Sequence, residues 1–324
     1  MSIHLVCALL ITVLSSSALA QLSPKEQAAK VRGLILYNQY KTVTATPFLT
    51  VAAEAGDYEA QYYLAETLRK NNRHMTLEAQ KWYEAAANQG DFYAMIQLGR
   101  SDDDMCKVME NCPDTKKKPI EWLNQAQRLA NPKAEQGDSE AMFIMYQLTI
   151  DQDWLEKSAN AGHAIAQYWM AIGEQEGSGV FLLPWKRSES IAKWLKASSE
   201  GGYPKAMMAY VAVLYKEGDM DGVRHWLEEA AKTGEQNAVS TYGAYLTHTP
   251  DRVGYPLDLV KGYGLISLLK ELDGGGSAQV YLEEKLPEIA AKMTPEQIAE
   301  ADEFTKKWKA THPPLSFFPD KLSR

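Results

Sequence analysis

The sequence lacks long hydrophobic runs and an excess of positive charge. No segment after residue 20 reaches about 18 apolar residues, the length that a membrane-spanning helix needs. Lys and Arg total 34 against 42 Asp and Glu, a net charge of −8, and an acidic chain repels the phosphate backbone of nucleic acids. The content of 45% hydrophobic and 23% charged residues excludes a disordered or collagenous chain. We therefore expect a globular protein without stable membrane insertion and without a nucleic-acid partner.

The motifs of common enzyme classes are also absent. The chain contains no G-x-S-x-G, no H-E-x-x-H, no P-loop and no kinase signature. The glycine-rich stretch Gly274–Ser277 follows no predicted strand, so we interpret it as an inter-helix turn rather than a phosphate-binding loop. The histidines after residue 20 have neither a second His at i+4 nor a nearby Cys: they are His74, His163, His225, His248 and His312. We predict no enzyme activity, no catalytic residue, no metal site and no cofactor.

Cysteine is scarce, with one residue, Cys7, near the start and two, Cys106 and Cys112, in the body of the chain. In an oxidising compartment an isolated close pair favours a structural disulfide, with two free thiols as the alternative. A metal site is disfavoured because no His or further Cys lies near enough to complete four ligands. A redox role is weakly supported because the spacing is not C-x-x-C.

The first 20 residues contain no Lys, Arg, Asp or Glu. Ile3–Leu14 is an apolar run, and Ala18–Ala20 matches an A-x-A cleavage site. The pattern predicts a signal peptide over residues 1–20 that is cut after Ala20, although its start lacks the usual Lys or Arg. A membrane anchor is the alternative interpretation. Cys7 lies within the apolar run and not at the cleavage point, so a lipid-anchored N-terminus is not expected.

A repeat runs through the rest of the chain. The pattern G-x-x-x-A recurs at Gly56/Ala60, Gly90/Ala94, Gly137/Ala141, Gly162/Ala166, Gly202/Ala206, Gly234/Ala238 and Gly274/Ala278. An aromatic residue stands eight positions before most of these glycines, as Phe48, Trp82, Trp154, Trp194 and Trp226. Trp122 precedes its glycine by fifteen, which indicates a local insertion. Repetition at such a period predicts an array of helical hairpins.

The repeat has a physical explanation. The segment from the aromatic residue to the glycine is the second helix of a hairpin, and the glycine supplies the left-handed residue that ends it. The alanine lets the axis of the next helix approach closely, and the aromatic side chain fills the gap between hairpins. A hairpin with two apolar faces cannot bury both alone, so neighbours stack into a solenoid. We therefore assign Trp82, Trp122, Trp154, Trp194 and Trp226 to packing.

These motifs resemble those of Sel1-like repeat proteins, relatives of the tetratricopeptide repeats. Gly177–Val180 matches the family's G-x-G-V turn, Trp194-Leu195 and Trp226-Leu227 match its W-L dipeptide, and Ala230–Gly234 matches its helix end. Asp258–Tyr263 resembles the opening of a terminal repeat, and Met293–Gln297 opens its closing helix, with Thr294 as N-cap and Gln297 completing a capping box. The resemblance implies an all-α fold, a right-handed superhelical α-solenoid of Sel1-like helix-turn-helix repeats.

The predicted organisation has four parts. Residues 1–20 are the signal peptide, 21–45 an N-terminal capping helix, 46–310 the repeats and 311–324 a non-helical, Pro-rich C-terminal tail. Successive repeat glycines are 34, 47, 25, 40, 32 and 40 residues apart, so the repeats are degenerate and irregular curvature is expected. The longest step contains the insertion 101–120, which carries the cysteine pair.

Candidate partner-binding residues come from the aromatic positions outside the packing pattern and from the insertion. First helices line the concave groove in this architecture, and exposed Tyr and Trp are typical of interfaces. The candidates are Tyr58, Tyr62, Phe92, Tyr93, Tyr168, Trp169, Trp185, Asp102, Asp103 and Asp104. For half of the aromatic candidates, packing between helices is the alternative interpretation. For the acidic run Asp102–Asp104, the alternative is a solvated surface.

Two further sites have two interpretations each. Trp185 is predicted in a loop, either as a plug or as a partner anchor. Phe317 and Phe318 either pack back on the last helix or form an exposed binding peptide.

Three function classes follow. Export and the resemblance together suggest a Gram-negative periplasm and a protein-binding solenoid that is monomeric when free. Some exported members of the family are immunity proteins that bind and silence an antibacterial phospholipase effector of type VI secretion, and degenerate repeats with a distinctive insertion suit one dedicated partner. The alternatives are a scaffold in envelope or exopolysaccharide assembly, and a β-lactam-binding or hydrolysing enzyme. The enzyme alternative is less well supported, because the Sel1-like proteins linked to β-lactams have a disulfide in every repeat and this chain has one cysteine pair after residue 20.

Overall fold

The computed structural model describes residues 22–115, 117–272 and 277–322. The predicted signal peptide and its cleavage site lie outside the described residues. The α-helices, in chain order, are α1 (Pro24–Asn38), α2 (Thr42–Glu54), α3 (Tyr58–Asn72), α4 (Leu77–Asn88), α5 (Phe92–Gly99), α6 (Met105–Val108), α7 (Pro119–Glu135), α8 (Ser139–Thr149), α9 (Gln152–Asn160), α10 (Ala164–Gln175), α11 (Pro184–Glu200), α12 (Pro204–Glu217), α13 (Met220–Lys232), α14 (Gln236–Leu246), α15 (Leu259–Ser267), α16 (Ser277–Ala290) and α17 (Pro295–Thr311). Two 3-10 helices, η1 (Ser101–Asp103) and η2 (Leu268–Leu272), complete them.

Glycine and alanine set the repeat as the pattern predicts. The glycines that end the second helices have positive φ: they are Gly56, Gly90, Gly137, Gly162, Gly202 and Gly234. The alanine four residues on is fully or almost fully buried in each case: Ala60, Ala94, Ala141, Ala166, Ala206 and Ala238. In most repeats the residue directly after the glycine caps the next helix, as Asp57 does by accepting a hydrogen bond from the amide of Ala60. One short motif therefore stops one helix, starts the next and brings their axes together.

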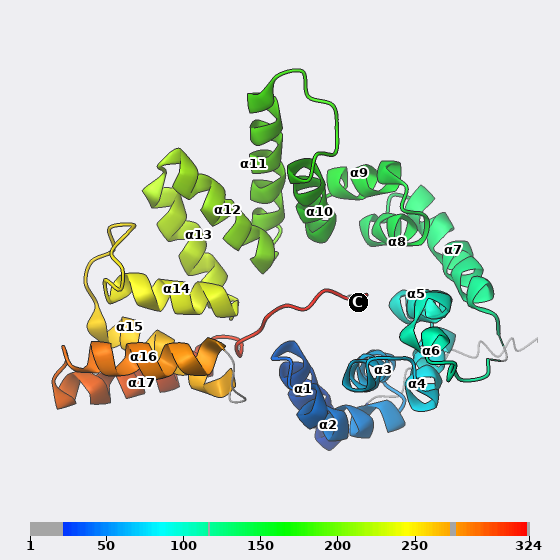
Figure 1. The fold of residues 1–324 in the computed structure, drawn as a ribbon, viewed down its shortest axis with the longest axis horizontal. Coiled ribbons are helices and arrows are strands. Elements are labelled where there is room, and N and C mark those ends of the chain that lie inside the picture. Colours follow the sequence, from blue (N-terminus) through cyan, green and yellow to red (C-terminus); the bar gives the residue numbers. More distant parts are fainter. Residues whose placement is uncertain (1–21, 116, 273–276, 323–324) are drawn as a thin grey trace, which may run out of the picture.

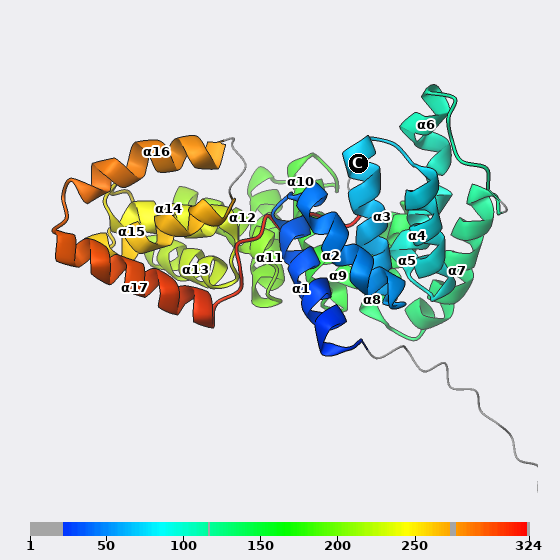
Figure 2. The same ribbon diagram turned by 90° about the horizontal axis from the view of Figure 1, so that it is seen from below.

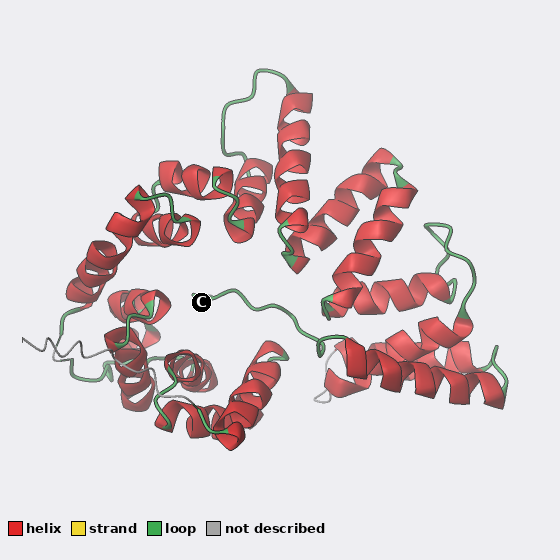
Figure 3. Ribbon diagram, turned by 180° about the vertical axis from the view of Figure 1, so that it is seen from behind, coloured by secondary structure: helices red, strands yellow, loops and turns green. Residues whose placement is uncertain are grey.

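The helices form an open ring in which most pack on their neighbours in sequence (Figure 1). Helices α1, α3, α5 and α8 lie nearer the centre of the ring than α2, α4, α7 and α9 (Figure 1). In the perpendicular view α16 and α17 flank α14 and α15, and α6 protrudes at the opposite end of the molecule (Figure 2). The described residues contain helices and loops but no strand, which confirms the all-α solenoid (Figure 3).

Both ends of the array are capped. Ser23 and Glu26 form a capping box at the start of α1, with Pro24 in the first turn. At the other end Thr294 caps α17 and Gln297 returns the hydrogen bond, as predicted. Helix α17 packs on α15 and covers the last hairpin. Among the described residues, no helix is both long enough and apolar enough to cross a membrane.

The tryptophans depart in part from the predicted packing role. Trp82 and Trp122 are buried, with 8% and 4% of their surface exposed. Trp154, Trp194 and Trp226 are only half-buried and lie at the edges of their clusters. The ammonium groups of Lys157 and Lys193 lie over the rings of Trp154 and Trp194, within reach of cation–π attraction.

A buried carboxylate joins the first helices, which the sequence pattern does not indicate. Glu66 of α3 is fully buried. Its carboxylate accepts hydrogen bonds from the hydroxyls of Tyr37 and Tyr83 and from the side-chain amide of Gln97. These partners come from α1, α4 and α5. Burial, followed by the nearby Glu66 carboxylate, raises the pKa of Tyr83, so its hydroxyl stays protonated and remains a donor. The network fixes the positions of the helices that carry the tyrosines described below.

Candidate functional site

The C-terminal residues occupy the centre of the ring. After α17 ends at Thr311 the chain runs without helix into the space enclosed by the solenoid (Figure 1). We call residues 313–322 the groove segment. The concave groove that holds it is formed by the end of α1 and by α3, α5, α8, α10, α12 and α14. Apart from α1, these helices follow a repeat glycine.

Main-chain hydrogen bonds hold the first part of the groove segment. The amide of Ser316 donates to the carbonyl of Gly234 at 2.9 Å, and the amide of Gln236 donates to the carbonyl of Ser316 at 3.1 Å, as in one step of a parallel β-ladder. On the other side the amide of Phe317 donates to the carbonyl of Asn38 at 3.0 Å. The segment therefore bridges α14 and the end of α1, two parts of the array that are far apart in sequence.

Gly234 is required for this close approach. Its φ is +82°, and a Cβ atom there would lie 2.5 Å from the carbonyl oxygen of Pro314. That separation is far below a van der Waals contact, so any side chain at residue 234 would push the segment away.

Two oppositely charged side chains anchor the second part of the groove segment. Asp320 accepts a hydrogen bond from the Tyr203 hydroxyl at 2.9 Å and pairs with the Lys205 ammonium at 2.7 Å. Burial, followed by the charge of Asp320, raises the pKa of Tyr203, so the phenol remains a hydrogen-bond donor at neutral pH.

The ammonium of Lys321 lies near three tyrosine rings. It is 4.3 Å from the ring centroid of Tyr93, 5.6 Å from that of Tyr62 and 5.9 Å from that of Tyr63. These distances are in the range of cation–π attraction. Next to it, Leu322 is buried and its amide donates to the Tyr62 hydroxyl at 3.4 Å.

Neither predicted alternative describes Phe317 and Phe318. The ring of Phe317 lies 4.9 Å from that of Tyr40, in the turn after α1. Phe318 faces the groove and lines its cavity. Both side chains are half-buried between the two sides of the ring rather than packed on the last helix or left free in solvent.

The groove segment leaves a cavity of about 690 Å³ beside it. Aromatic side chains dominate its wall on α5, α8 and α10, with Tyr93, Tyr146 and Trp169 among them. Phe318, Asp320 and Lys321 of the groove segment form the facing side. The volume lies within the ~300–1,000 Å³ range of ligand-binding pockets.

Glu140 provides a negative charge at the wall of this cavity. It accepts hydrogen bonds from the Tyr93 hydroxyl at 2.8 Å and from Nε2 of His163 at 2.7 Å. Nδ1 of His163 accepts from the amide of Ala166, which leaves Nε2 to carry the proton. The hydrogen bond from His163, followed by the one from Tyr93, lowers the pKa of Glu140 despite the opposing effect of burial. The carboxylate is therefore ionised at neutral pH.

The groove brings several of the predicted contact residues together. Tyr62, Tyr93 and Trp169 surround the cavity or the Lys321 anchor, and Tyr168 packs edge-on against Tyr203 at 5.2 Å. Tyr62, with 1% exposure, is covered, so a partner reaches it only after the groove segment moves.

Two other predicted aromatic residues lie outside this cluster. Phe92 is half-buried under the ammonium of Lys133, and Tyr58 is exposed in the first turn of α3.

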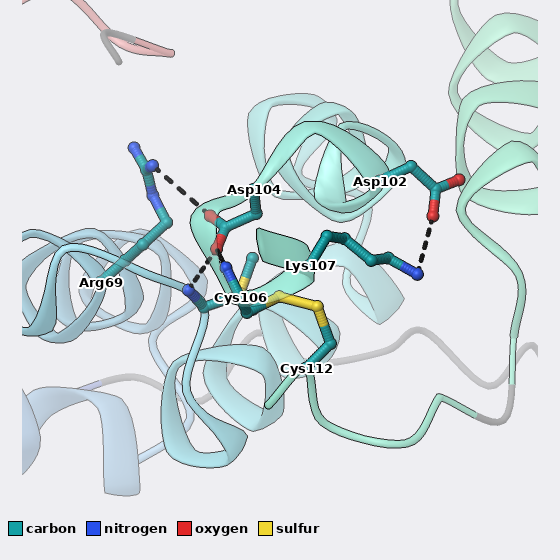
Figure 4. The surroundings of a disulfide bond; sticks show 7 residues. Arg69, Asp102, Asp104, Cys106, Lys107 and Cys112 are labelled. Carbon is teal, nitrogen blue, oxygen red and sulfur yellow. Dashed lines mark hydrogen bonds and ion pairs between the residues drawn. A yellow bond between two sulfur atoms is a disulfide. The ribbon is translucent and has the colours of Figure 1, made fainter. Parts of the chain in front are cut away.

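The insertion carries the predicted acidic residues and the disulfide (Figure 4). Cys106 and Cys112 are joined by a disulfide that closes the turn after α6. Asp104 caps α6, accepts from the amide of Met75 at 2.7 Å and pairs with Arg69, so its carboxylate holds the insertion against α3 and the start of α4 (Figure 4). Asp102 is exposed and pairs with Lys107 at 3.2 Å. Asp103 ends η1. The acidic run is thus divided, and Asp104 is a structural residue rather than part of a solvated face.

Trp185 lies in the first turn of α11 and not in a loop, because Pro184 begins that helix. It is 56% exposed and plugs no cavity. Val180 and Leu182 just before it are 94% and 93% exposed, and Leu183 is exposed as well. We call the exposed loop residues Val180, Leu182 and Leu183, together with Trp185 in the adjoining first turn of α11, the apolar loop. It projects away from the centre of the ring between α10 and α11 (Figure 1).

The side chain of Arg187 holds the backbone of this loop in place. Its guanidinium donates to the carbonyls of Glu174 and Ser178 at 2.6 and 2.7 Å and lies over the ring of Phe181. The loop is therefore held in shape while its apolar side chains point to solvent, an arrangement that is typical of interaction sites.

Sequence analysis missed the residues that bind the groove segment. Lys205 and Tyr203 lie at the start of an otherwise ordinary helix. Asn38 ends α1, and the side-chain amide of Gln39, its C-cap, donates to the carbonyl of Leu315 at 3.1 Å. The one available signal was the run of apolar and Pro residues after Thr311, which is unusual for a solvated tail. Within the described ranges, no group of three or more His, Cys, Asp or Glu side chains is placed to hold a metal ion.

Comparisons with known proteins gave structural neighbours only. No model of a protein family matches the chain, and no curated protein matches it. A protective antigen present in uropathogenic Escherichia coli strains, which displays an SLR fold, is similar over 92% of this chain and 82% of its own, with 17% identity and a TM-score of 0.33. A Sel1 repeat protein from Oxalobacter formigenes is similar over 71% and 94%, with 21% identity and a TM-score of 0.38. The pilF protein of Pseudomonas aeruginosa is similar over 83% and 98%, with 15% identity and a TM-score of 0.28. At these identities and TM-scores the three structures assign no partner or activity to this chain.

Proposed function

We propose that this chain is a protein-binding solenoid whose concave groove receives a segment of a partner protein. The observation that carries the proposal is that the groove already holds an extended peptide, its own residues 313–322, through main-chain and side-chain contacts. A surface that satisfies the hydrogen bonds of one extended chain is suited to another. The solenoid supplies a large concave surface for this purpose.

Two further features support recognition of a protein. Tyr and Trp line the groove, and these residues contribute most to protein interfaces because they bury a large area with few rotatable bonds. The apolar loop adds a second exposed patch, and no helix of the described residues covers it.

We further propose that the partner is an antibacterial lipase or phospholipase effector of type VI secretion, and that the chain is its periplasmic immunity protein. The support is the predicted signal peptide, the resemblance to exported Sel1-like repeat proteins and the disulfide-stapled insertion, which suits one dedicated partner. An immunity protein acts by tight one-to-one binding that blocks the effector.

The test is inhibition of the purified effector. The chain from Gln21 is titrated into the effector while hydrolysis of a fluorogenic phospholipid is followed. The proposal expects complete inhibition at a 1:1 ratio. It also expects loss of inhibition by at least tenfold for W169A in the groove or W185A in the loop. The control K306A changes an exposed ion pair on α17 and should inhibit normally.

A cellular experiment separates the immunity role from binding in general. A strain that lacks the gene should be killed by the parent strain in co-culture and rescued by the chain in trans. If the deleted strain survives and the purified chain instead captures several envelope-assembly proteins, the immunity role is wrong and an assembly scaffold takes its place.

A further inference from the structure

The groove segment makes the contacts of a peptide ligand. Its main chain pairs with Gly234 and Gln236 on one side and with Asn38 on the other. Its side chains enter separate subsites, and only Leu315, Ser316 and Leu322 are buried among its ten residues. These are sequence-tolerant backbone contacts combined with a few selective side-chain contacts, the usual division between affinity and specificity in strand recognition.

The two charged subsites differ in sign and lie next to each other. Lys205 and the hydroxyl of Tyr203 hold the carboxylate of Asp320. Tyr93, Tyr62 and Tyr63 surround the ammonium of Lys321. Because the two anchors are consecutive residues, the groove accepts an acidic residue followed by a basic one and disfavours the reverse order. Glu140 strengthens this preference because its negative charge lies at the wall beyond Tyr93.

The segment fills its groove incompletely. The cavity of about 690 Å³ beside Phe318 and Lys321 is open to a larger ligand. Pro313, Pro314 and Lys321 remain exposed. A partner segment with a bulkier side chain at the position of Phe318 or Lys321 would bury aromatic surface on α8 and α10 that the chain's own segment leaves uncovered.

From these contacts we infer that residues 313–322 are an internal ligand of the concave groove. The partner replaces them with an extended segment of its own that carries an acidic residue followed by a basic one. This inference rests on the proposed protein-binding function and specifies its site and the chemistry of the partner. The internal segment is tethered at Thr311, so it competes at an effective concentration that is ~mM for a short linker. It thereby raises the affinity that a partner needs and excludes poorly matched segments.

The experiment uses the chain from Gln21 and a fluorescein-labelled peptide with the sequence of residues 311–322. Binding is measured by fluorescence anisotropy. The double variant D320A/K321A weakens the internal ligand without touching the groove and should bind the peptide at least tenfold more tightly than the unsubstituted chain. Adding Lys205→Glu to the double variant should remove that gain. A matched control, E303A/K306A, removes an exposed ion pair on α17 and should bind like the unsubstituted chain.

The order of charges is tested with a second peptide in which Asp and Lys exchange places. The double variant should bind it at least tenfold more weakly than the native order. Hydrogen exchange gives a readout that needs no substitution: saturating native peptide should accelerate exchange of the Ser316 and Phe317 amides in the unsubstituted chain. Equal affinity of the peptide for the unsubstituted chain and the double variant, or equal affinity for both charge orders, would overturn the inference.

The same measurements distinguish this inference from the proposed function. If a partner protein binds while residues 313–322 keep their protection, the internal-ligand inference is wrong and the protein-binding function stands. If the peptide behaves as expected but the chain does not bind or inhibit the effector, the internal ligand stands and the proposed partner is wrong.

Discussion

The concave groove and the apolar loop are both rich in aromatic and aliphatic side chains, but only the groove is covered. In the groove, Tyr62 lies under Leu322, and the groove segment satisfies carbonyls and amides on both sides of the ring. In the loop, Val180 and Leu182 are almost fully exposed, and Arg187 holds the backbone without hiding them. The groove therefore contributes to folding, and under the proposed function to recognition as well, whereas the loop side chains would contribute to recognition alone.

This difference separates two kinds of mutational effect. A substitution in the groove should change stability first and binding as a consequence. A substitution in the loop should leave stability unchanged and act on the partner only. The four predictions below test that contrast, beginning with the largest expected change in stability.

Tyr62→Ala should destabilise the protein by about 3–5 kcal/mol, because it removes a fully buried aromatic ring and leaves a cavity. Chemical denaturation followed by circular dichroism measures the change. Tyr62→Phe is the matched control and should cost far less, since its hydroxyl makes only a long contact with the amide of Leu322, at 3.4 Å. Equal losses for the two variants would show that the hydroxyl, and not the ring, holds this side of the groove.

Gly234→Ala should cost more than Gly202→Ala. Both glycines have φ near +80°, so each alanine pays about 1–2 kcal/mol for the left-handed conformation. Nothing lies within 4 Å of a Cβ at residue 202, whereas a Cβ at residue 234 would collide with the Pro314 carbonyl. The additional loss of stability of Gly234→Ala over Gly202→Ala measures the cost of releasing the groove segment. This release should appear as faster proteolysis after residue 312, and identical proteolysis of the two variants would contradict the role of Gly234.

Glu140→Gln should produce a smaller effect that depends on pH. The pKa of Glu140 is lowered in the folded protein, so ionised Glu140 adds stability above its ordinary pKa, and this contribution is lost as pH falls through the lowered value. Stability of the unsubstituted chain should therefore drop more steeply below pH 4.5 than that of the variant. Thermal melts between pH 3 and 7 test this, and parallel curves would exclude a contribution from the pair with His163.

Trp185→Ala should have the smallest effect on folding, within about 0.5 kcal/mol, because the ring is exposed and plugs no cavity. Its effect on partner binding should be at least tenfold, as expected for an exposed aromatic anchor. Calorimetric titration with the partner measures the second quantity. A large loss of stability with unchanged binding would reverse the assignment of the loop.

The repeat architecture could be predicted because its determinants are local. Gly90 ends one helix and Ala94 packs the next, whatever the rest of the chain does, so the short pattern indicates hairpins directly. The capping box of Thr294 and Gln297 was predictable for the same reason, since all its atoms lie within one turn. Such motifs leave a fixed spacing in the sequence.

The groove could not be predicted in the same way. Tyr93 and Trp169 were identified as inner-face residues. Nothing in their spacing shows that Lys321 approaches Tyr93 or that Asp320 lines the same cavity as Trp169. The half-buried state of Trp194 also depends on how neighbouring hairpins tilt, which the irregular repeat lengths leave open. These contacts join residues more than a hundred positions apart.

By itself the sequence determined the repeat helices, their order and their hairpin pairing, because backbone φ at glycine, side-chain capping and apolar periodicity act over a few residues. Only the tertiary structure decided that the array curves around its own C-terminal segment, that Tyr62 is covered and that Asp104 braces the insertion. Each of these depends on the cumulative rotation between hairpins, and a small difference per repeat decides which distant side chains meet at the centre of the ring.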